Sequence, residues 1–266
     1  MSPKFNRKYS GSITCRYAFG YDPKINNYKV VRIVCPSNAD TMVSEVEIYT
    51  LGSNSWRTIR DTPYNILGRL PGVFMNGVIH WLSNPLPSRS NSKFSHVLLS
   101  FNMSEEVFLE IPYPVIFEKF EHVSLDAFKG LLCMLCCHSN VGFEIWVMSD
   151  YGVTDSWTKL YTIARLKLFD TVAFFRQLRR IQSVRNGEII LLEIQIDYAY
   201  AALVFYDPKH EKARVMEIDP KEQKGFSYPN GRLEKKCYTV TYVESLVSLH
   251  SGYHVEAEKK EGSDFR

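Results

Sequence analysis

Apolar residues recur along the chain in short stretches separated by tight polar turns, and one such arrangement occurs four times. Each copy is an apolar strand, a polar turn and a second strand, at residues 46–59, 98–111, 143–163 and 203–218. The corresponding apolar side chains of the second strands are Trp56, Phe108, Trp157 and Val215, at intervals of 52, 49 and 58 residues. A period of about 50 residues is typical of kelch-like β-propellers, in which each repeat forms one blade.

A further pair of strands precedes three of these copies and predicts a hairpin in each. The turns of these hairpins are Asn76-Gly77, Lys129-Gly130 and Asn186-Gly187, where glycine supplies the positive φ angle that a two-residue connection needs. The first copy is preceded instead by residues 19–33, with a longer turn at Asp22-Pro23 and Asn26-Asn27. Together the hairpins and the copies give four units of four strands.

This organisation predicts an all-β fold, a kelch-like β-propeller with four four-stranded blades and no amphipathic helix between them. The predicted blades are residues 17–60, 72–111, 123–163 and 181–218. An alternating segment at 237–249 predicts a closing C-terminal strand, so that residues 17–250 form the propeller domain. Residues 1–16 and 251–266 are polar or charged and are predicted to be an N-terminal tail and a disordered C-terminal tail.

Composition and charge narrow the classes of function. Of the 266 residues, 45% are hydrophobic and 14% aromatic, which is enough to bury a sizeable core. A net charge of +3 is too small for a dedicated nucleic-acid binder, so we expect no nucleic-acid partner. The start is polar and basic, and no stretch approaches the roughly 18 apolar residues of a membrane span. We therefore expect no secretory signal, no membrane partner and a cytoplasmic protein, with a nuclear location left open.

The residues whose side chains could bind a metal or act in catalysis are better explained as core residues. The sequence CMLCCH at 133–138 has the Cys-x-x-Cys spacing of a zinc or redox site, but it lies in a continuous apolar run. The seven histidines form no pair at metal-ligand spacing, and His80 is predicted to be structural or at a rim. Trp56, Phe108 and Trp157 are predicted to pack between neighbouring blades. We therefore expect no catalytic residue, no cofactor and no metal.

Connections of different length leave the two faces of the predicted propeller. The short turns share one face, and the long connections, including 84–96, 164–180 and 219–236, leave from the other because strand direction alternates. Long loops on a rigid scaffold concentrate binding functions, and aromatic and arginine side chains dominate protein interfaces. The predicted partner-binding residues on these loops are Arg89, Lys93, Phe94, Arg176, Arg179, Arg180, Phe226 and Tyr228.

Six segments together give the chain a resemblance to a known family. They are FGYDPKINNYKVVRI, VEIYTLGSNSWRTI, PGVFMNGVIHWLS, LLSFNMSEEVFLEIP, FEIWVMSDYGVTDSWTKLYTI and YVESLVSL, which cover most of residues 17–250. In this order they resemble the F-box-associated region of plant F-box proteins, of the S-locus F-box type. The resemblance implies a module that recruits substrates to an SCF-type ubiquitin ligase and performs no chemistry. In the S-locus branch, the implied target is a pistil ribonuclease of the self-incompatibility system.

One departure from the family pattern changes what the resemblance implies. Family members begin with an F-box that docks on a Skp-type adaptor, followed by an Asn-Pro-Ser/Thr segment, and neither is found in this sequence. We therefore expect no adaptor binding by these residues, and an incomplete ring. Two alternatives stay open: a truncated, non-functional F-box-like product, and a propeller enzyme with an axial active site. The apolar character of the predicted axial strands disfavours the enzyme.

Overall fold

Antiparallel β-strands form nearly all of the regular structure in the computed structural model. The structure describes residues 13–36, 44–59, 62, 64–66, 71–85, 96–111, 113–138, 141–164, 177–184, 189–195, 201–216, 225–227 and 233–235. Two short 3-10 helices, η1 (Val115–Lys119) and η2 (Thr154–Ser156), accompany the strands in these ranges. No helix in the described part of the chain has both the length and the apolar character needed to cross a bilayer.

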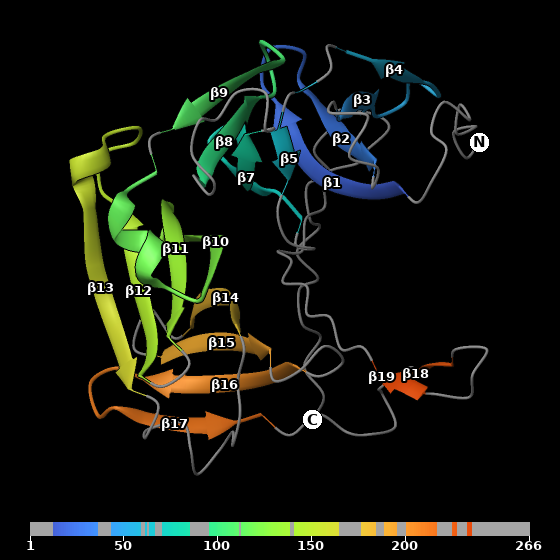
Figure 1. Cartoon of the computed structure of the whole chain (residues 1–266). Coiled ribbons are helices and arrows are strands. Elements are labelled where there is room, and N and C mark those ends of the chain that lie inside the picture. The colour runs from blue at the N-terminus through green and yellow to red at the C-terminus, as the bar shows by residue number, and fades with distance from the viewer. Residues whose placement is uncertain are drawn as a thin grey trace, which may run out of the picture.

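The first seventeen strands form four antiparallel sheets, which follow one another in chain order as the blades of a β-propeller (Figure 1). The first blade contains β1 (Ile13–Asp22), β2 (Asn27–Pro36), β3 (Glu45–Thr50) and β4 (Trp56–Thr58). The second contains β5 (Tyr64–Ile66), β6 (Val73–Met75), β7 (Val78–Pro85), β8 (Val97–Asn102) and β9 (Val107–Ile111). The third contains β10 (His122–Phe128), β11 (Leu131–His138), β12 (Gly142–Met148) and β13 (Trp157–Ala164). The fourth contains β14 (Gln177–Val184), β15 (Ile189–Gln195), β16 (Ala201–Asp207) and β17 (Lys212–Val215).

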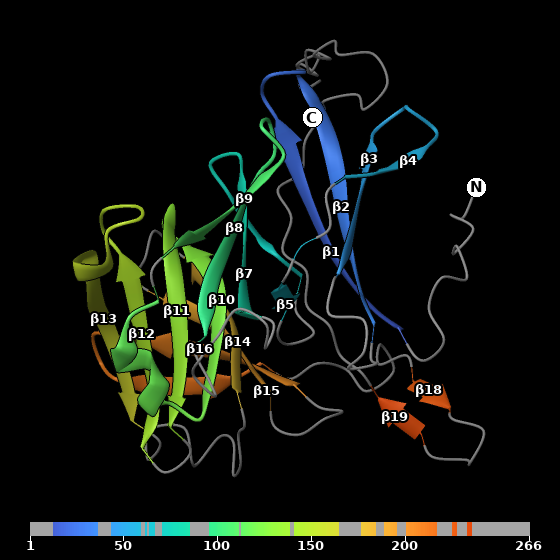
Figure 2. The ribbon, with the colours of Figure 1, turned by 45° about the horizontal axis from the view of Figure 1, so that its top comes forward.

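The blades are arranged around an arc, with the first strand of each blade toward the middle and the last strand outside (Figure 1). A hairpin of β18 (Gly225–Ser227) and β19 (Leu233–Lys235) follows the fourth blade. Figure 2 shows β1 and β2 as a long hairpin at one end of the arc, and in Figure 1 β18 and β19 lie apart from the four blades. The predicted all-β propeller with four blades is confirmed.

Turn chemistry explains how the inner hairpins form. At Asn76-Gly77 the two φ angles are 50° and 79°, and at Lys129-Gly130 they are 51° and 77°. Two consecutive positive φ angles define the tight turn whose twist matches that of the flanking strands, and glycine adopts them without strain. These two predicted hairpins are confirmed by the pairing of β6 with β7 and of β10 with β11. The turn at Asn186-Gly187 lies outside the described residues.

The inner strand of the second blade is interrupted, which the sequence did not predict. The predicted blades 17–60 and 72–111 leave 61–71 between them, but β5 lies in this segment and pairs with β7 at Ser83–Pro85, while β6 pairs with β7 at Val78–His80. From Ile66 to Val73 the chain advances seven residues while the partner positions on β7 advance three, from Ser83 to His80. The inner strand therefore carries four extra residues between its two halves.

Three clusters of buried side chains fill the seams between neighbouring blades. The first seam, between the first and second blades, is built on residues including Ile33, Ile48, Trp81, Leu99 and Phe101. The second seam, between the second and third blades, includes Leu98, Phe117, Leu132, Met134 and Trp157. The third seam, between the third and fourth blades, includes Leu135, Ile145, Leu178, Ile190 and Val204. Each seam has an apolar centre because alternate residues of a strand point to the same face of its blade, and those that face the neighbouring blade are mostly apolar.

In the second, third and fourth blades, equivalent residues of the repeat point toward the preceding blade. Phe108 packs into the first seam, Trp157 into the second and Val215 against the third. Trp157 is 8% exposed, so its predicted position between blades is confirmed. For Trp56 the prediction is wrong, because this side chain is only half-buried and lies on the face of the first blade that points away from the first seam. Among the described residues, no blade precedes the first one to cover it.

Candidate functional site

The predicted partner-binding residues fall mostly outside the described part of the chain. Those outside it are Arg89, Lys93, Phe94, Arg176 and Tyr228. The backbone of Phe226 belongs to β18, in a segment that was predicted to be a loop. Arg179 and Arg180 lie on β14, so their assignment to a loop at 164–180 is wrong. β14 begins at Gln177 because Leu178 and Ile181 supply the apolar side chains that pack in the third seam.

Arg179 is held against its own blade. Its Nε donates a hydrogen bond to Oε1 of Gln195 at 3.1 Å, and its Nη1 lies 3.7 Å from Oε1 of Glu193. A shift of register between Leu178 and Arg180 in the pairing of β14 with β15 produces this arrangement. An arginine whose guanidinium is occupied by its own sheet is a poor anchor for a partner protein.

Asp126, on the inner strand β10, is a buried carboxylate that the sequence analysis missed. Its Oδ2 accepts a hydrogen bond from the backbone N–H of Ile181 at 2.8 Å, across the third seam, and its Oδ1 accepts one from Ala127 at 2.9 Å. Burial raises the pKa of Asp126, and the backbone hydrogen bonds and nearby Arg180 oppose that rise. The signal in the sequence is a single carboxylate inside the otherwise apolar and small-residue strand 123–128. The contacts assign this group to holding two blades together.

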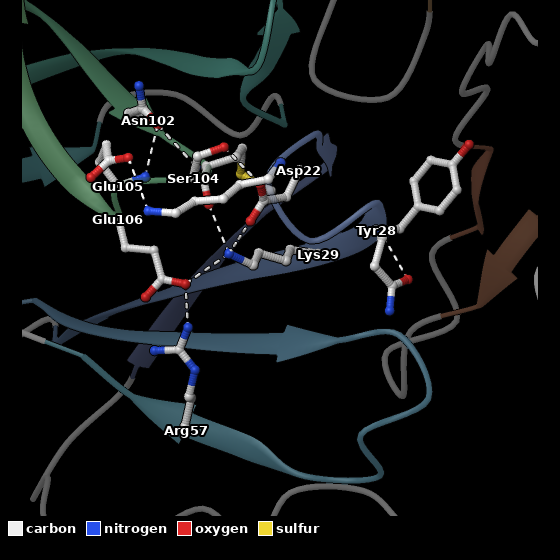
Figure 3. Close-up of polar contacts among 11 residues, drawn as sticks. Asp22, Tyr28, Lys29, Arg57, Asn102, Ser104, Glu105 and Glu106 are labelled. Carbon is white, nitrogen blue, oxygen red and sulfur yellow. Dashed lines mark hydrogen bonds and ion pairs between the residues drawn. The ribbon is translucent and has the colours of Figure 1, made fainter. Parts of the chain in front are cut away.

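A buried cluster of charges joins the first and second blades at the edge that carries the short turns (Figure 3). Lys29 of β2 is at its centre. Its Nζ lies 2.5 Å from Oδ2 of Asp22 and 2.8 Å from Oε1 of Glu106, and it donates to the carbonyl oxygen of Met103 at 2.8 Å. Arg57 pairs with the same carboxylate of Glu106 from the first blade. We call this set, Asp22, Lys29, Arg57 and Glu106, the Lys29 cluster.

In the Lys29 cluster, the two carboxylates are balanced by two cations, Lys29 and Arg57. Burial alone would raise the pKa of Asp22, but bonds from Lys29, the Ser104 hydroxyl and the Lys24 amide together lower it. The same competition lowers the pKa of Glu106 through Arg57 and Lys29. Burial alone would lower the pKa of Lys29, but Asp22 and Glu106 raise it. Each group is held in its charged form by its partners, so the cluster stabilises the seam and offers no free acid or base.

His80 has the corresponding place in the second seam. Lys29 and His80 are each the third residue of the second strand in their hairpin, and each side chain reaches the turn between the last two strands of the next blade. Nδ1 of His80 lies 3.1 Å from the carbonyl oxygen of Val73, an acceptor only, so Nδ1 carries the proton and donates. Nε2 then accepts a hydrogen bond from the Tyr151 hydroxyl at 2.7 Å. Burial lowers the pKa of His80 to about 4, so the ring is neutral at pH 7.

The cysteine-rich strand is part of the core, as predicted. Cys133, Cys136 and Cys137 of β11 are all completely buried, and burial is the main cause of the raised pKa of each, to about 12 for Cys137. Thiols with such pKa values stay protonated and are poor nucleophiles and metal ligands. Among the residues that the structure describes, no group of three or more His, Cys, Asp or Glu side chains could hold a metal ion.

Two groups of apolar side chains remain exposed on the described surface. One lies along the outside of the second blade and on η1, where Val107, Leu109, Val115 and Ile116 are exposed. The other is on the first blade, on the face opposite the first seam. We call it the open face; its residues are Tyr17, Phe19, Tyr21, Tyr28, Arg32, Glu47, Tyr49 and Trp56, of which Tyr17 and Phe19 are exposed, Arg32 is buried and the others are half-buried.

Aromatic contacts organise the open face. Phe19 and Tyr28 are stacked, with ring centroids 5.2 Å apart and planes 6° from parallel, and Tyr49 lies 5.5 Å from Trp56. The Arg32 guanidinium lies 4.6 Å from the centroid of the Trp56 ring and pairs with Glu47. Phe19 is nevertheless 55% exposed. The open face is thus a rigid, mainly aromatic surface whose central charges neutralise each other.

Comparison with known proteins adds a family match. A model of the F-box associated beta propeller domain matches residues 3–245. F-box protein CPR1 of Arabidopsis thaliana is 27% identical over 231 residues, which cover 78% of this chain and 54% of that protein. F-box/WD-40 repeat-containing protein 1 of the same plant is 28% identical over 252 residues, covering 88% of this chain and 59% of that protein. The chain therefore spans little more than half the length of these relatives.

A similarity to a solved structure is weaker. The crystal structure of TolB from Acinetobacter baumannii matches with a TM-score of 0.44 and 11% sequence identity, over 83% of this chain and 47% of that one. A score this low adds nothing to the architecture seen in the four sheets.

Proposed function

The chain belongs to the F-box-associated β-propeller family, and from that premise we propose that it is the target-binding module of an F-box protein. In this role it holds a target protein for ubiquitin transfer by a ligase and carries out no chemistry itself. The observation that carries the proposal is the extent of the family match, which runs from residue 3 to residue 245 and therefore includes all four blades. Both relatives described above are F-box proteins by name.

The described side chains support a scaffold better than an active site. Asp22, Lys29, Asp126 and His80 are buried or nearly so, and each is occupied by a partner in its own seam or in the adjacent blade. A general acid or base must instead reach a substrate with an available proton or lone pair. These contacts favour target binding over the alternative of a propeller enzyme with an axial site.

We place target binding on the face that carries the long connections. The opposite edge, which carries the short turns, has a structural role, because the Lys29 cluster and the His80–Tyr151 contact hold these turns in place. Arg89, Lys93, Phe94, Arg176, Phe226 and Tyr228 remain our candidate anchors. Arg179 is not among these anchors because it is bonded to its own sheet, and neither is its neighbour Arg180 on the same inner strand. A rigid ring presenting variable loops fits a module that distinguishes one target protein from another.

The first target to test is a pistil ribonuclease, because the chain resembles the S-locus type of F-box protein in the segments described above. Adaptor binding is assigned to no residue of this chain. The chain spans little more than half of its relatives, and ligase recruitment is a proposal for a protein that also carries an F-box.

The test supplies the ligase connection directly. An F-box is fused to the N-terminus of the chain, the fusion is assembled with a Skp-type adaptor and a cullin, and ubiquitin transfer to purified ribonucleases is measured. Transfer should be lost when residues 84–96, 165–176 and 219–236 are exchanged for those of a relative with another target. It should persist when the short turns at 51–55 and 208–211 are exchanged.

A matched pair of single substitutions sharpens the same experiment. Arg176→Ala should weaken target binding, whereas Arg214→Ala, at an exposed arginine on the outermost strand β17, should not. If the short-turn exchange alone moves target choice, the proposed surface is wrong. If the fusion ubiquitinates no ribonuclease and captures no other protein that it ubiquitinates, the proposed function is wrong.

A further inference from the structure

The outermost strand of the second blade, β9, lacks the protection found on the other three outer strands. An outer strand presents a row of unpaired backbone N–H and C=O groups, and proteins protect such an edge with a short strand, a bulge or charged side chains, above all lysine. β4 has only three residues, β13 has a register shift and an exposed Lys159, and β17 has four residues with Lys212 and Arg214 exposed. β9 instead pairs regularly with β8 over five residues and contains no lysine or arginine.

The side chains along the free edge of β9 are apolar and exposed. Figure 1 shows β9 on the outside of its blade, and in the described part of the chain only β8 pairs with it. Val107 and Leu109 point to the same face of the strand, and they are 46% and 60% exposed. Glu110, on the other face, is also exposed and is the only charged residue of the strand. A strand added to this edge covers both aliphatic side chains and pairs the backbone groups.

A turn of the third blade borders the same face of β9. This turn, between β12 and β13, reaches the second blade through Tyr151, whose side chain interacts with His80 and Ser100. Ser100 in turn donates a hydrogen bond to the carbonyl oxygen of Leu109 at 2.9 Å, so the turn lies beside β9. Tyr151 and Val153 of the turn are themselves 51% and 50% exposed. A segment added to β9 therefore has an apolar wall beside it.

η1 extends this apolar surface beyond the end of β9. Ile111, the last residue of β9, and Phe117 of η1 are buried in the same second seam, so η1 stays close to the strand. Val115 and Ile116 of η1 are exposed. Monomeric proteins rarely leave a continuous apolar surface in water unless it binds something. We call this surface the β9 rim; its residues are Val107, Leu109, Val115, Ile116, Tyr151 and Val153.

Exposed charges around the β9 rim are mostly negative, although the whole chain carries a net charge of +3. On β9, η1 and the turn between β12 and β13, Lys119 is the one exposed cation, and nearby Lys159 is bonded to Glu144. The exposed carboxylates on these three segments are Glu110, Glu118, Asp150 and Asp155. A basic partner complements this pattern, whereas a second copy of the rim brings like charges together.

We propose that the β9 rim binds an extended segment of a partner protein, which adds to β9 as a further strand and alternates apolar with basic side chains. The apolar face of the segment packs on Val107, Leu109 and Val153. Its other face carries lysine or arginine, because Glu110 lies on the opposite side of β9 from Leu109. This interaction goes beyond the proposed target binding, since it uses none of the candidate anchors on the long connections. Either surface can fail its test without the other.

Selection of peptides by the full chain tests the proposal without a known partner. Short random peptides displayed on phage are selected on the immobilised protein, and the enriched sequences should alternate apolar with basic residues. Leu109→Lys gives β9 the protecting lysine that it lacks, and it should weaken binding of an enriched peptide by about tenfold or more. Leu160→Lys, at an exposed leucine of the outer strand β13, is the matched control and should leave binding unchanged. Failure to enrich such peptides, or equal binding by Leu109→Lys, overturns the proposal.

Methylation of the peptide backbone tests whether the segment adds as a strand. In an added strand, alternate N–H groups point toward β9 and the others point away. N-methylation of one alternating set in an enriched peptide should therefore abolish binding, and N-methylation of the other set should be tolerated. Equal effects of the two sets overturn strand addition. Sedimentation of the chain alone tests the remaining occupant: a dimer that Leu109→Lys dissociates means that a second copy covers β9, and this also overturns the proposal.

Discussion

Lys29 of the first blade and Glu106 of the second face each other across the first seam, with Nζ 2.8 Å from Oε1. The Lys29 side chain is only 5% exposed, and Asp22 lies on its other side. Transferring an ammonium group from water into the protein interior costs free energy, and here two carboxylates and a carbonyl oxygen offset that cost. The pair ties the β1–β2 hairpin to the β8–β9 turn, so its loss should be felt by both blades.

Lys29→Met should therefore destabilise the fold by about 3–5 kcal/mol, because it leaves the buried carboxylate of Asp22 without its cation and Glu106 with only the half-exposed Arg57. Lys24→Met is the matched control. Lys24 pairs with Glu105 at 3.3 Å on the same edge, but both side chains are mostly exposed. Its loss should change the free energy of unfolding by less than about 1 kcal/mol. Urea denaturation of the two variants measures the difference in the free energy of unfolding. Similar losses for both variants would mean that the Lys29 cluster does not hold the two blades together.

Trp157 and Trp56 provide a second comparison, between equivalent residues with different surroundings. Trp157→Ala should cost about 3–5 kcal/mol, because the ring packs against Phe117 at a centroid distance of 5.3 Å within the second seam. Trp56→Ala should cost less, about 1–2 kcal/mol, since less apolar surface is removed from water around a half-buried ring. Thermal or urea unfolding measures both changes. An equal, large cost at Trp56 would show that it is as deeply packed as Trp157.

Local sequence was sufficient to predict the hairpins and the number of blades. Asn76-Gly77 and Lys129-Gly130 dictate their turns through the backbone angles that glycine allows, a property of two neighbouring residues. The repeat at Trp56, Phe108 and Trp157 likewise gave the blade order. The same repeat could not show whether a blade precedes the first one, and for this reason the burial of Trp56 was predicted wrongly.

Contacts between blades were beyond prediction from sequence. In the sequence, nothing distinguishes Lys29 from a surface lysine. In the fold, Glu106, which is 77 residues further along the chain, lies within 2.8 Å of it. From the sequence alone, Arg179 is predicted to lie in a basic loop. Its place beside Gln195 depends on the register shift in the pairing of β14 with β15, which the sequence does not reveal. No turn signal after Ala164 marks the start of β14 in the sequence, so the loop predicted at 164–180 overlaps the first four residues of the strand.

Gly20 is required by a close approach between the inner strands of the first and second blades. A Cβ atom at this position would lie 2.5 Å from the ring of Phe74, closer than two carbon atoms can approach. Gly20→Ala should therefore destabilise by about 1–3 kcal/mol through forced movement of that ring. Phe74→Leu combined with Gly20→Ala should recover part of the loss. A double-mutant cycle from chemical denaturation measures this coupling, and strictly additive effects would contradict the contact.

His80 should make the stability of the fold depend on pH between about 6.5 and 4. Its pKa is lowered by burial from the ordinary 6.5 to about 4. Above pH 6.5 the ring is neutral in both the folded and the unfolded chain, so its contribution to stability is fully present. As the pH falls below 6.5, only the unfolded chain takes up the proton, and this favours unfolding until the pH reaches about 4. The gap between the two pKa values corresponds to about 3 kcal/mol.

His80→Gln removes this titration and separates it from that of other groups. Between pH 6.5 and 4, the wild-type protein should lose about 3 kcal/mol more of its free energy of unfolding than the variant does. Asp22 and Glu106 also lose stabilising free energy as the pH approaches 4, because their pKa values are lowered in the folded chain and the unfolded chain takes up the proton first, but this loss is common to both proteins and cancels in the difference. Urea titrations across this range measure the slopes. Parallel curves for wild type and His80→Gln would show that the second seam does not hold this ring neutral.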